Sequence, residues 1–180
     1  MEHSSRLAAE LRWFAVYTRS KAEIKVAERL SVAGFDNFLP LHTVIKQWSD
    51  RKKKVQVPLI NSYVFVKSDS KNLTNIYKVP GVINILKYLG KYAIVKDYEI
   101  ENLRILTNSG FPMHTYNAPI DLAEGEKVTI TKGVFEGLSA TYLMDAGKHK
   151  IIVVLEALNS FIEVTLPLNT IQKASLNKIG

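Results

Sequence analysis

The sequence predicts an α+β protein: an α/β sandwich, with a mainly antiparallel sheet flanked by helices, followed by a small β-barrel. Strand-like and helix-like segments alternate up to residue 108, whereas only short strand-like segments follow residue 123. The charge changes in the same region. Residues 1–110 contain 18 Lys/Arg against 10 Asp/Glu (+8), and residues 111–180 contain 6 against 7 (−1). A basic domain beside a neutral one indicates that the first part meets a polyanion, although a solvated surface explains the charge equally well.

The first segments suit a layered α/β domain. Trp13–Thr18 is rich in aromatic and β-branched residues, which predicts a strand. Apolar residues then recur every three or four positions over Lys21–Ala33, so a helix is expected, ending at Gly34. Two β-rich runs around a basic tip, Thr43–Trp48 and Val55–Pro58, predict a hairpin.

The same domain continues with four further elements. We expect a strand over Ser62–Lys67, a short helix over Lys71–Val79 that stops at Pro80-Gly81, and a strand over Val82–Tyr88. Asp97–Asn108 is amphipathic and predicts a closing helix.

The region Thr107–Ala123 has Gly and Pro but no periodicity, and is predicted to be a linker. A barrel is expected after it, because closure removes exposed strand edges. Its predicted strands are Lys127–Thr131, Ser139–Met144, Lys150–Leu155, Phe161–Leu166 and Thr170–Gln172. Ile151–Leu158 could also be helical. The expected organisation is an N-terminal extension (1–11), an α/β domain (12–108), a linker (109–122), a barrel (123–175) and a tail (176–180).

Composition and spacing argue against catalysis. The chain has no cysteine, and its four histidines lie in unrelated segments. Neither a phosphate-binding glycine loop nor a nucleophile motif occurs. We therefore expect a binding protein without metal or cofactor, not an enzyme. No apolar run reaches the roughly 20 residues of a membrane span, and the N-terminus lacks a signal-peptide pattern, so a soluble, cytoplasmic monomer is expected.

Two basic groups are candidates for nucleic-acid contact. The hairpin tip contains Arg51, Lys52, Lys53 and Lys54 beside Trp48, which either stacks on a base or packs locally. The alternative for this tip is a solvated loop that protects a sheet edge. The second group, on and before the first helix, comprises Arg19, Lys21, Lys25 and Arg29. Nearby Glu residues weaken its case through surface ion pairs.

Tyr63 and Phe65 have the same parity on one strand and so project to the same face. Ile85 and Tyr88 belong to the next strand region. These side chains either form a core under a helix or, if exposed, a protein-docking patch.

Residues Glu124–Gly137 resemble the KOW motif of small SH3-like barrels in transcription and translation proteins. Its characteristic positions here are Gly125, Gly133, Phe135 and Gly137. The glycines permit positive φ, so that Phe135 packs or projects from the loop.

The N-terminal half resembles the N-terminal (NGN) domain of NusG-family transcription factors. The matching segments, in order, are Trp13–Thr18, Lys21–Leu30, Phe38–Pro40, Tyr63–Val66, Val79–Val82 and Gly90–Leu103. With the KOW region, the resemblance covers Arg12 to Ala174.

Within that family the chain is similar to specialised RfaH- and UpxY-type antiterminators. Trp48–Val55 followed by Pro58-Leu59 resembles the latter. The KOW segment departs from the housekeeping pattern, which has Pro where Val134 stands and often Gly at Ala140. The region of Leu158–Ser160 lacks the housekeeping loop associated with termination-factor and ribosome contacts. Asn61-Ser62 stands where Pro-Gly is common, which leaves that turn open.

The resemblance implies a set of partners. Tyr63, Phe65, Ile85 and Tyr88 would dock on the clamp helices of the RNA polymerase β′ subunit, and Asn72, Thr74 and Asn75 would touch the gate loop of the β subunit. Bridging both sides would favour a closed clamp and suppress pausing. The cations that would face upstream DNA or the non-template strand are Arg19, Lys25, Arg29 and Lys78.

Three functions stay open at this point. The leading one is a specialised elongation and antitermination factor for selected operons. The first alternative is a housekeeping factor that couples polymerase to a termination factor or ribosome, with a ribosomal-protein contact through the KOW domain. The second is a KOW-containing ribosomal or RNA-binding protein, for which the slightly acidic barrel is a poor match.

Overall fold

The computed structural model of the chain describes residues 10–48, 50–116, 125–131, 133–145, 148–166 and 176–178. None of the described helices is long and apolar enough to cross a membrane. The chain divides into two compact units. The first runs up to Leu39 and resumes over Ser62–Ile94, and the second comprises Pro40–Asn61 and the residues from Val95 onward. The predicted α+β class is confirmed: the N-terminal part is α/β with an antiparallel sheet, and the C-terminal part is all-β.

The sheet of the first unit is centred on β1 (Arg12–Thr18). β1 pairs antiparallel with β5 (Tyr63–Ser68) on one side and with β6 (Val82–Ile85) on the other. β2 (Asp36–Phe38) extends the sheet beyond β5, giving the order β2-β5-β1-β6. Strand β9 (Ile94–Val95) lies where the units meet in the sequence.

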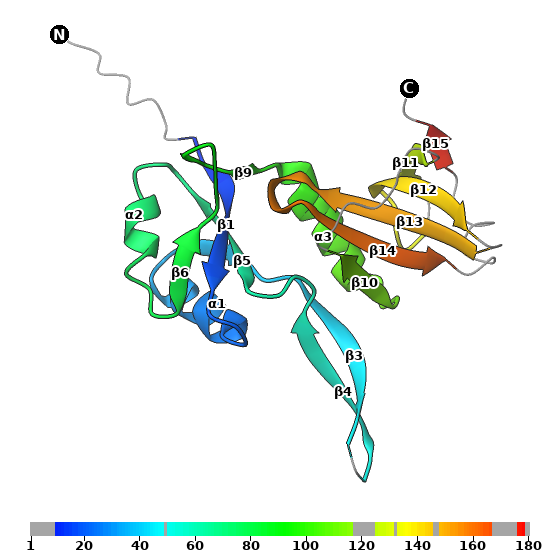
Figure 1. Cartoon of the computed structure of the whole chain (residues 1–180), viewed down its shortest axis with the longest axis horizontal. Coiled ribbons are helices and arrows are strands. Elements are labelled where there is room, and N and C mark those ends of the chain that lie inside the picture. The colour runs from blue at the N-terminus through cyan, green and yellow to red at the C-terminus, as the bar shows by residue number, and fades with distance from the viewer. Residues whose placement is uncertain are drawn as a thin grey trace. The chain divides into compact units, whose positions relative to one another are not determined.

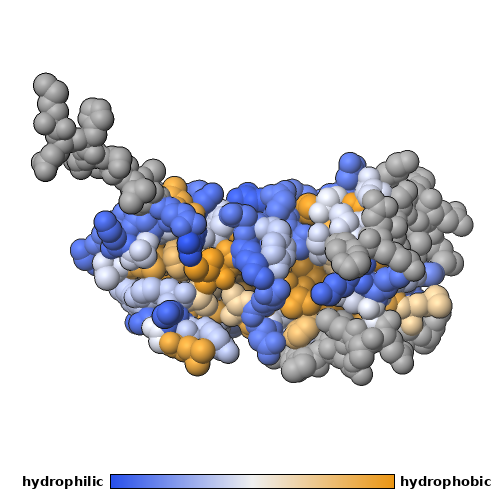
Figure 2. All heavy atoms as spheres, turned by 90° about the horizontal axis from the view of Figure 1, so that it is seen from above, coloured by the Kyte–Doolittle hydropathy of each residue, from blue (hydrophilic) through white to orange (hydrophobic). Residues whose placement is uncertain are grey.

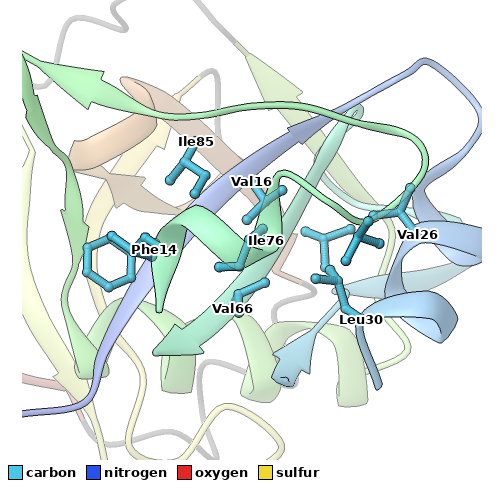
Figure 3. Packing of buried hydrophobic residues seen from close by; sticks show 10 residues of the cluster. Phe14, Val16, Val26, Leu30, Val66, Ile76 and Ile85 are labelled. Carbon is cyan, nitrogen blue, oxygen red and sulfur yellow. The ribbon is translucent and has the colours of Figure 1, made fainter. Parts of the chain in front are cut away.

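Two helices cover one face of this sheet. Val26 and Leu30 of α1 (Glu23–Val32) and Leu73 and Ile76 of α2 (Leu73–Ile76) are fully buried. They pack in a single cluster with the strand side chains that project from the same face of the sheet (Figure 3). The strand members of that cluster are Phe14, Val16, Val64, Val66 and Ile85. Each such burial contributes roughly 1.5–3 kcal/mol, so this cluster holds the layers together.

The entry to β5 is fixed by a turn at Ser62, whose φ is +62°. The Ser62 N–H donates to Glu23 Oε1 at 2.7 Å, and its carbonyl accepts from the Thr18 N–H at 2.8 Å. Glycine adopts this left-handed conformation more readily than serine does. The buried Glu23 carboxylate therefore holds in place a turn that the sequence left open.

Two predicted elements are shorter than expected. The helix expected over Lys71–Val79 contains only α2, because Lys78 and Val79 close turns onto Asn75 and Ile76. The strand expected over 82–88 is interrupted at Leu86, whose N–H donates to the Ala15 carbonyl. The second half becomes β7 (Lys87–Tyr88), which pairs with β8 (Lys91–Tyr92) in a separate hairpin.

The second unit contains an antiparallel sheet of six strands in the order β10-β14-β13-β12-β11-β15 (Figure 1). The strands are β10 (Met113–Tyr116), β11 (Glu126–Ile130), β12 (Ser139–Asp145), β13 (Lys148–Leu155), β14 (Ser160–Leu166) and β15 (Leu176–Lys178). A 3-10 turn, η1 (Glu156–Leu158), follows β13, so the helical alternative for residues 151–158 was wrong over the strand.

The ends of this sheet correct two sequence predictions. Residues 113–116 of the predicted linker form β10, which pairs with β14. Residues 176–178 of the predicted tail form β15, which pairs with β11. Both segments are too short to show periodicity, so partner pairing alone reveals them. The strand predicted over Thr170–Gln172 lies outside the described residues.

The hairpin predicted around the basic tip is present as β3 (Leu41–Gln47) and β4 (Lys52–Pro58), and it belongs to the second unit. Its base is fixed by backbone contacts. The Leu59 N–H donates to the Pro40 carbonyl at 2.8 Å, and the Leu59 carbonyl accepts from Thr115 Oγ1 at 2.9 Å. The ribbon projects away from the six-stranded sheet of the same unit (Figure 1).

Helix α3 (Asp97–Asn108) is attached to the same sheet by buried polar groups. Asn102 bonds both backbone groups of Ser139: its Nδ2 donates to the carbonyl at 3.1 Å, and its Oδ1 accepts from the N–H at 3.2 Å. The Glu99 carboxylate accepts from the N–H groups of Lys96 and Glu156, at 2.8 and 2.7 Å. Burial raises the pKa of Glu99, and these bonds oppose that effect.

Replacing Asn102 should therefore loosen the second unit. Asn102→Ala removes two hydrogen bonds and leaves the Ser139 backbone groups unpaired, so the free energy of unfolding should fall by about 2–3 kcal/mol. Asn108→Ala is the matched control, because Asn108 is exposed on the same helix. It should change stability by less than ~0.5 kcal/mol in urea denaturation. Equal effects of the two substitutions would contradict the attachment.

Candidate nucleic-acid and protein interface

The predicted aromatic patch is divided between the two faces of the first sheet. Ile85 pairs with Val16 and belongs to the helix-covered core, so its predicted place in a docking patch is wrong. Tyr63 and Phe65 project from the opposite face, as do their β1 partners Tyr17 and Ala15. Parity along a single strand predicted the Tyr63–Phe65 face correctly, but it could not place Ile85, whose face depends on the register with β1.

Exposure differs within this face. Phe65 is 0% exposed, so it is not an open docking side chain in this structure. Tyr63 is half-buried, and Tyr17 is 39% exposed. Their rings lie 5.3 Å apart, and burial, followed by the neighbouring Tyr17, raises the pKa of Tyr63. Tyr17 was missed by the sequence reasoning, although the alternation of Trp13, Ala15 and Tyr17 along the first strand carries the signal.

Tyr88 lies elsewhere in the unit, on the β7–β8 hairpin. It is 73% exposed, and its neighbour Leu89 is exposed too. Tyr88 thus fits the predicted exposed side chain, but it lies on a separate two-stranded sheet from Tyr63. The face drawn in Figure 2 shows hydrophobic residues exposed between hydrophilic ones.

The segment around α2 presents a row of polar side chains at three-residue spacing, two of which are amides. Asp69 begins it, accepting from the N–H groups of Lys71 and Asn72 at 2.8 and 2.9 Å. The bond from the Asn72 N–H is the main reason that the pKa of Asp69 is lowered. Asn75 Nδ2 donates to Asn72 Oδ1, and Lys78 Nζ donates to Asn75 Oδ1 at 2.8 Å. Thr74 is exposed beside this row, so the predicted Asn72, Thr74 and Asn75 set lies on the surface.

Two of the basic residues of the first unit are bonded to the turn at residues 78–81. The Arg29 Nη1 donates to the Pro80 carbonyl at 2.7 Å, and the Arg19 N–H donates to the Gly81 carbonyl at 3.1 Å. Lys21 and Lys25 are exposed before and on α1. The turn that follows Lys78 is therefore bonded to Arg29 of α1 and to Arg19, which are far from it in the sequence.

The hairpin register distributes the second basic group over two faces. Lys53 is opposite Lys46 on one face. Lys52 and Lys54, opposite Gln47 and Ile45, lie on the other face. Lys46 was missed by the sequence reasoning, which took only the consecutive cations at the tip.

The tip itself is less cationic than its sequence suggests. The Arg51 side chain lies 3.9 Å from the Asp50 carboxylate, and both groups are largely exposed. Such a pair is weak, but it offsets the Arg51 charge locally. The Trp48 N–H donates to the Arg51 carbonyl, and the Trp48 side chain is 57% exposed.

The KOW-like segment is a tight, packed loop. Gly133 and Gly137 adopt φ values of +89° and +85°, and Phe135 between them is buried against Phe111, with ring centroids 5.1 Å apart. Phe135 therefore packs rather than projects. Gly125 leads into β11. Within the described ranges, no group of three or more His, Asp or Glu residues could hold a metal ion.

Comparison with known proteins gives one family match. The family described as "Transcription termination factor nusG" matches residues 11–104. A solved structure described as "Domain interaction in Thermotoga maritima NusG" is 21% identical, with 95% of this chain and 98% of that chain covered and a TM-score of 0.49. Conformations A and B of an "MjSpt4:Spt5 complex" are 21% and 23% identical, each over 93% of this chain and over 99% and 97% of theirs, with TM-scores of 0.30 and 0.31.

The stability of the turn to which Arg19 and Arg29 are bonded should depend on Gly81. A Cβ at Gly81 would lie 2.7 Å from Val26 Cγ2, and its φ is +99°. We expect Gly81→Ala to lower the free energy of unfolding by ~2–4 kcal/mol, combining backbone strain with overlap in the core. Gly34→Ala isolates the strain, because Gly34 has φ +83° and open space around it, and should cost only ~1–2 kcal/mol. Urea denaturation of both variants measures the difference, and equal losses would refute the close packing.

Proposed function

Because the chain belongs to the NusG family of transcription factors, we propose that it is a specialised elongation and antitermination factor. In this role it binds the RNA polymerase clamp and the upstream or non-template DNA, and it suppresses pausing and termination on selected operons. Members of the family are not enzymes and act by binding RNA polymerase. The family match over residues 11–104 is the observation that carries the proposal.

The proposed polymerase-docking face is the sheet surface opposite α1 and α2. Tyr17 and Tyr63 are the members of this face that a partner can reach, and Phe65 lies beside them on the same strand. Tyrosine pairs suit this task, because they supply large contact area with little conformational entropy to lose. The proposed partner is the clamp helices of the β′ subunit, with Tyr88 as a separate exposed contact.

Asn72, Thr74 and Asn75 are the proposed contact with the gate loop of the β subunit. Asn72 and Asn75 are already linked by a hydrogen bond, and Asp69 fixes the start of the segment. Side chains that are already ordered lose little entropy when they bind. Contacts on both the β and β′ subunits would favour the closed clamp, and a closed clamp disfavours pausing.

Arg19, Lys21, Lys25, Arg29 and Lys78 are the proposed DNA contacts of the first unit, and Arg51–Lys54 those of the hairpin. Exposed lysines and arginines contact phosphates irrespective of sequence, so they position the factor on DNA. The proposed polymerase-binding domain spans residues 12–108 and the KOW domain residues 123–175, in a cytoplasmic, monomeric factor.

The specialised role is proposed from the KOW region. Val134 stands where housekeeping members have Pro, and Ala140 where they often have Gly. The connection from β13 to β14 is a short turn of Glu156–Asn159, which leaves no long loop there for a termination factor or ribosome. The housekeeping role remains the alternative. A ribosomal or general RNA-binding protein does not account for the match over residues 11–104.

Polymerase binding tests the docking face. We expect Tyr17→Ala/Tyr63→Ala to weaken binding to purified core RNA polymerase by at least about ten-fold, because truncating two interface aromatics costs ~2 kcal/mol or more. The matched control is Tyr116→Ala/Met144→Ala, which removes two exposed apolar side chains from the second unit. Circular dichroism verifies that both variants are folded. Unchanged binding by the tyrosine variant would reject this face, and no binding by the unaltered chain would reject the function.

Transcription in vitro separates the specialised role from the housekeeping one. On a template with pause sites and a factor-dependent terminator, the chain should shorten pauses and raise the yield of full-length transcript, because it favours the closed clamp. Adding the termination factor should not reverse this effect. Increased termination in its presence would instead support the housekeeping alternative.

A further inference from the structure

We infer that the β3–β4 hairpin is a ribbon that enters the major groove of duplex DNA tip first, with one phosphate backbone on each of its two faces. This inference rests on the nucleic-acid contact of the proposed function and names the form of nucleic acid that the hairpin fits. It extends the candidate set to Lys46, and it assigns Lys46 with Lys53 to one strand of the duplex and Lys52 with Lys54 to the other.

The charge of the hairpin is concentrated near its tip, where, in the described part of the chain, its lysines, unlike Arg51, have no acidic partner. Residues 41–58 contain five Lys/Arg and one Asp, a net charge of +4. The one acid, Asp50, is beside Arg51. Among the residues that the structure describes, the four lysine ammonium groups of the hairpin have no ion-pair partner within the range of a salt bridge.

Lys46 and Lys53 are a cross-strand pair of like charge, which destabilises an isolated ribbon. An anion bound between them would relieve that repulsion. On the opposite face, Lys54 is across from Ile45 and Lys52 is across from Gln47, so a second pair of cations lies next to an isoleucine that is 65% exposed. Each face therefore offers two ammonium groups to one row of phosphates.

This two-sided arrangement favours a duplex. A single strand offers one phosphate row and is typically held by one face that carries several stacking aromatics. The hairpin has only Trp48 near its tip, whereas both of its faces are cationic. A groove between two phosphate backbones matches both faces at once.

The dimensions select the major groove of B-form DNA. Side chains make a β-layer about 10 Å thick, and the major groove is about 12 Å wide, so a two-stranded ribbon fits between its walls. The minor groove, about 6 Å wide, is too narrow, and the major groove of A-form RNA is too deep and narrow for side chains to enter. At about 3.3 Å per residue, strands of seven residues are long enough to cross the groove wall while the base of the hairpin stays outside.

Fluorescence anisotropy of the full chain with labelled oligonucleotides tests the inference without polymerase, so its outcome is independent of the polymerase-binding test. The variants are Lys46→Gln/Lys53→Gln, Lys52→Gln/Lys54→Gln and the fourfold combination. The matched control is Lys91→Gln/Lys148→Gln, which neutralises two exposed lysines outside the hairpin. The probes are duplex DNA, its single strand and an RNA duplex of the same sequence.

We expect tighter binding to duplex DNA than to either other probe. Each face variant should weaken duplex binding at low salt by about ten-fold or more and reduce the slope of log Kd against log salt by about 2, since each phosphate contact contributes ~0.9. The fourfold variant should lose about twice that slope. Methyl green, which occupies the major groove, should displace the chain, and netropsin, which occupies the minor groove, should not.

Several results would overturn the inference. Loss of affinity confined to one face would place a single phosphate row against the hairpin. Equal or tighter binding to the single strand or to the RNA duplex would reject the groove. If the control and fourfold variants had the same affinity, or if the unaltered chain did not bind duplex DNA, the hairpin would be a solvated loop without a role in DNA binding.

Discussion

The pairing of β1 with β5 is the constraint on which the rest of the first unit depends. Because Val16 faces Val64 and Phe14 faces Val66, one side of the sheet becomes a continuous apolar surface for α1 and α2. The same register necessarily places Tyr17 opposite Tyr63 on the other side. A slip by one residue would exchange the two sets of side chains. The core and the proposed docking face are therefore set by one pattern of backbone hydrogen bonds.

That constraint also organises the polar features around the sheet. The bond from the Thr18 N–H to the Ser62 carbonyl closes the end of the β1–β5 pair, and Glu23 holds Ser62 from the start of α1. Next to β6, the Arg19 N–H donates to the Gly81 carbonyl. Gly81 approaches Val26 so closely that no side chain fits there. Arg19 and Arg29, two of the proposed DNA-contacting cations, are thus bonded to a backbone that core packing fixes, while both residues stay exposed.

In the second unit, strand pairing likewise decides which side chains lie on the same face. The hairpin register turns a run of consecutive cations into two charged faces and adds Lys46 to one of them. Helix α3 is attached through Asn102 and Glu99, whose side chains satisfy backbone groups that strand pairing leaves open. Buried polar groups of this kind demand specific partners, since an unpaired one costs ~1–3 kcal/mol. They therefore specify where the helix lies on the sheet.

The sequence by itself determined the fold class, most of the strands and the main helices, because alternation and three-to-four spacing reflect which side chains must leave water. It also identified the KOW-like loop, the basic hairpin and the Tyr63–Phe65 parity. The tertiary structure alone decided that Ile85 belongs to the core, that Tyr17 joins Tyr63, that Lys46 joins Lys53, and that residues 113–116 form a strand. Each of these depends on which residue of a distant strand is opposite, and register between segments far apart in the chain leaves no periodic trace in either of them.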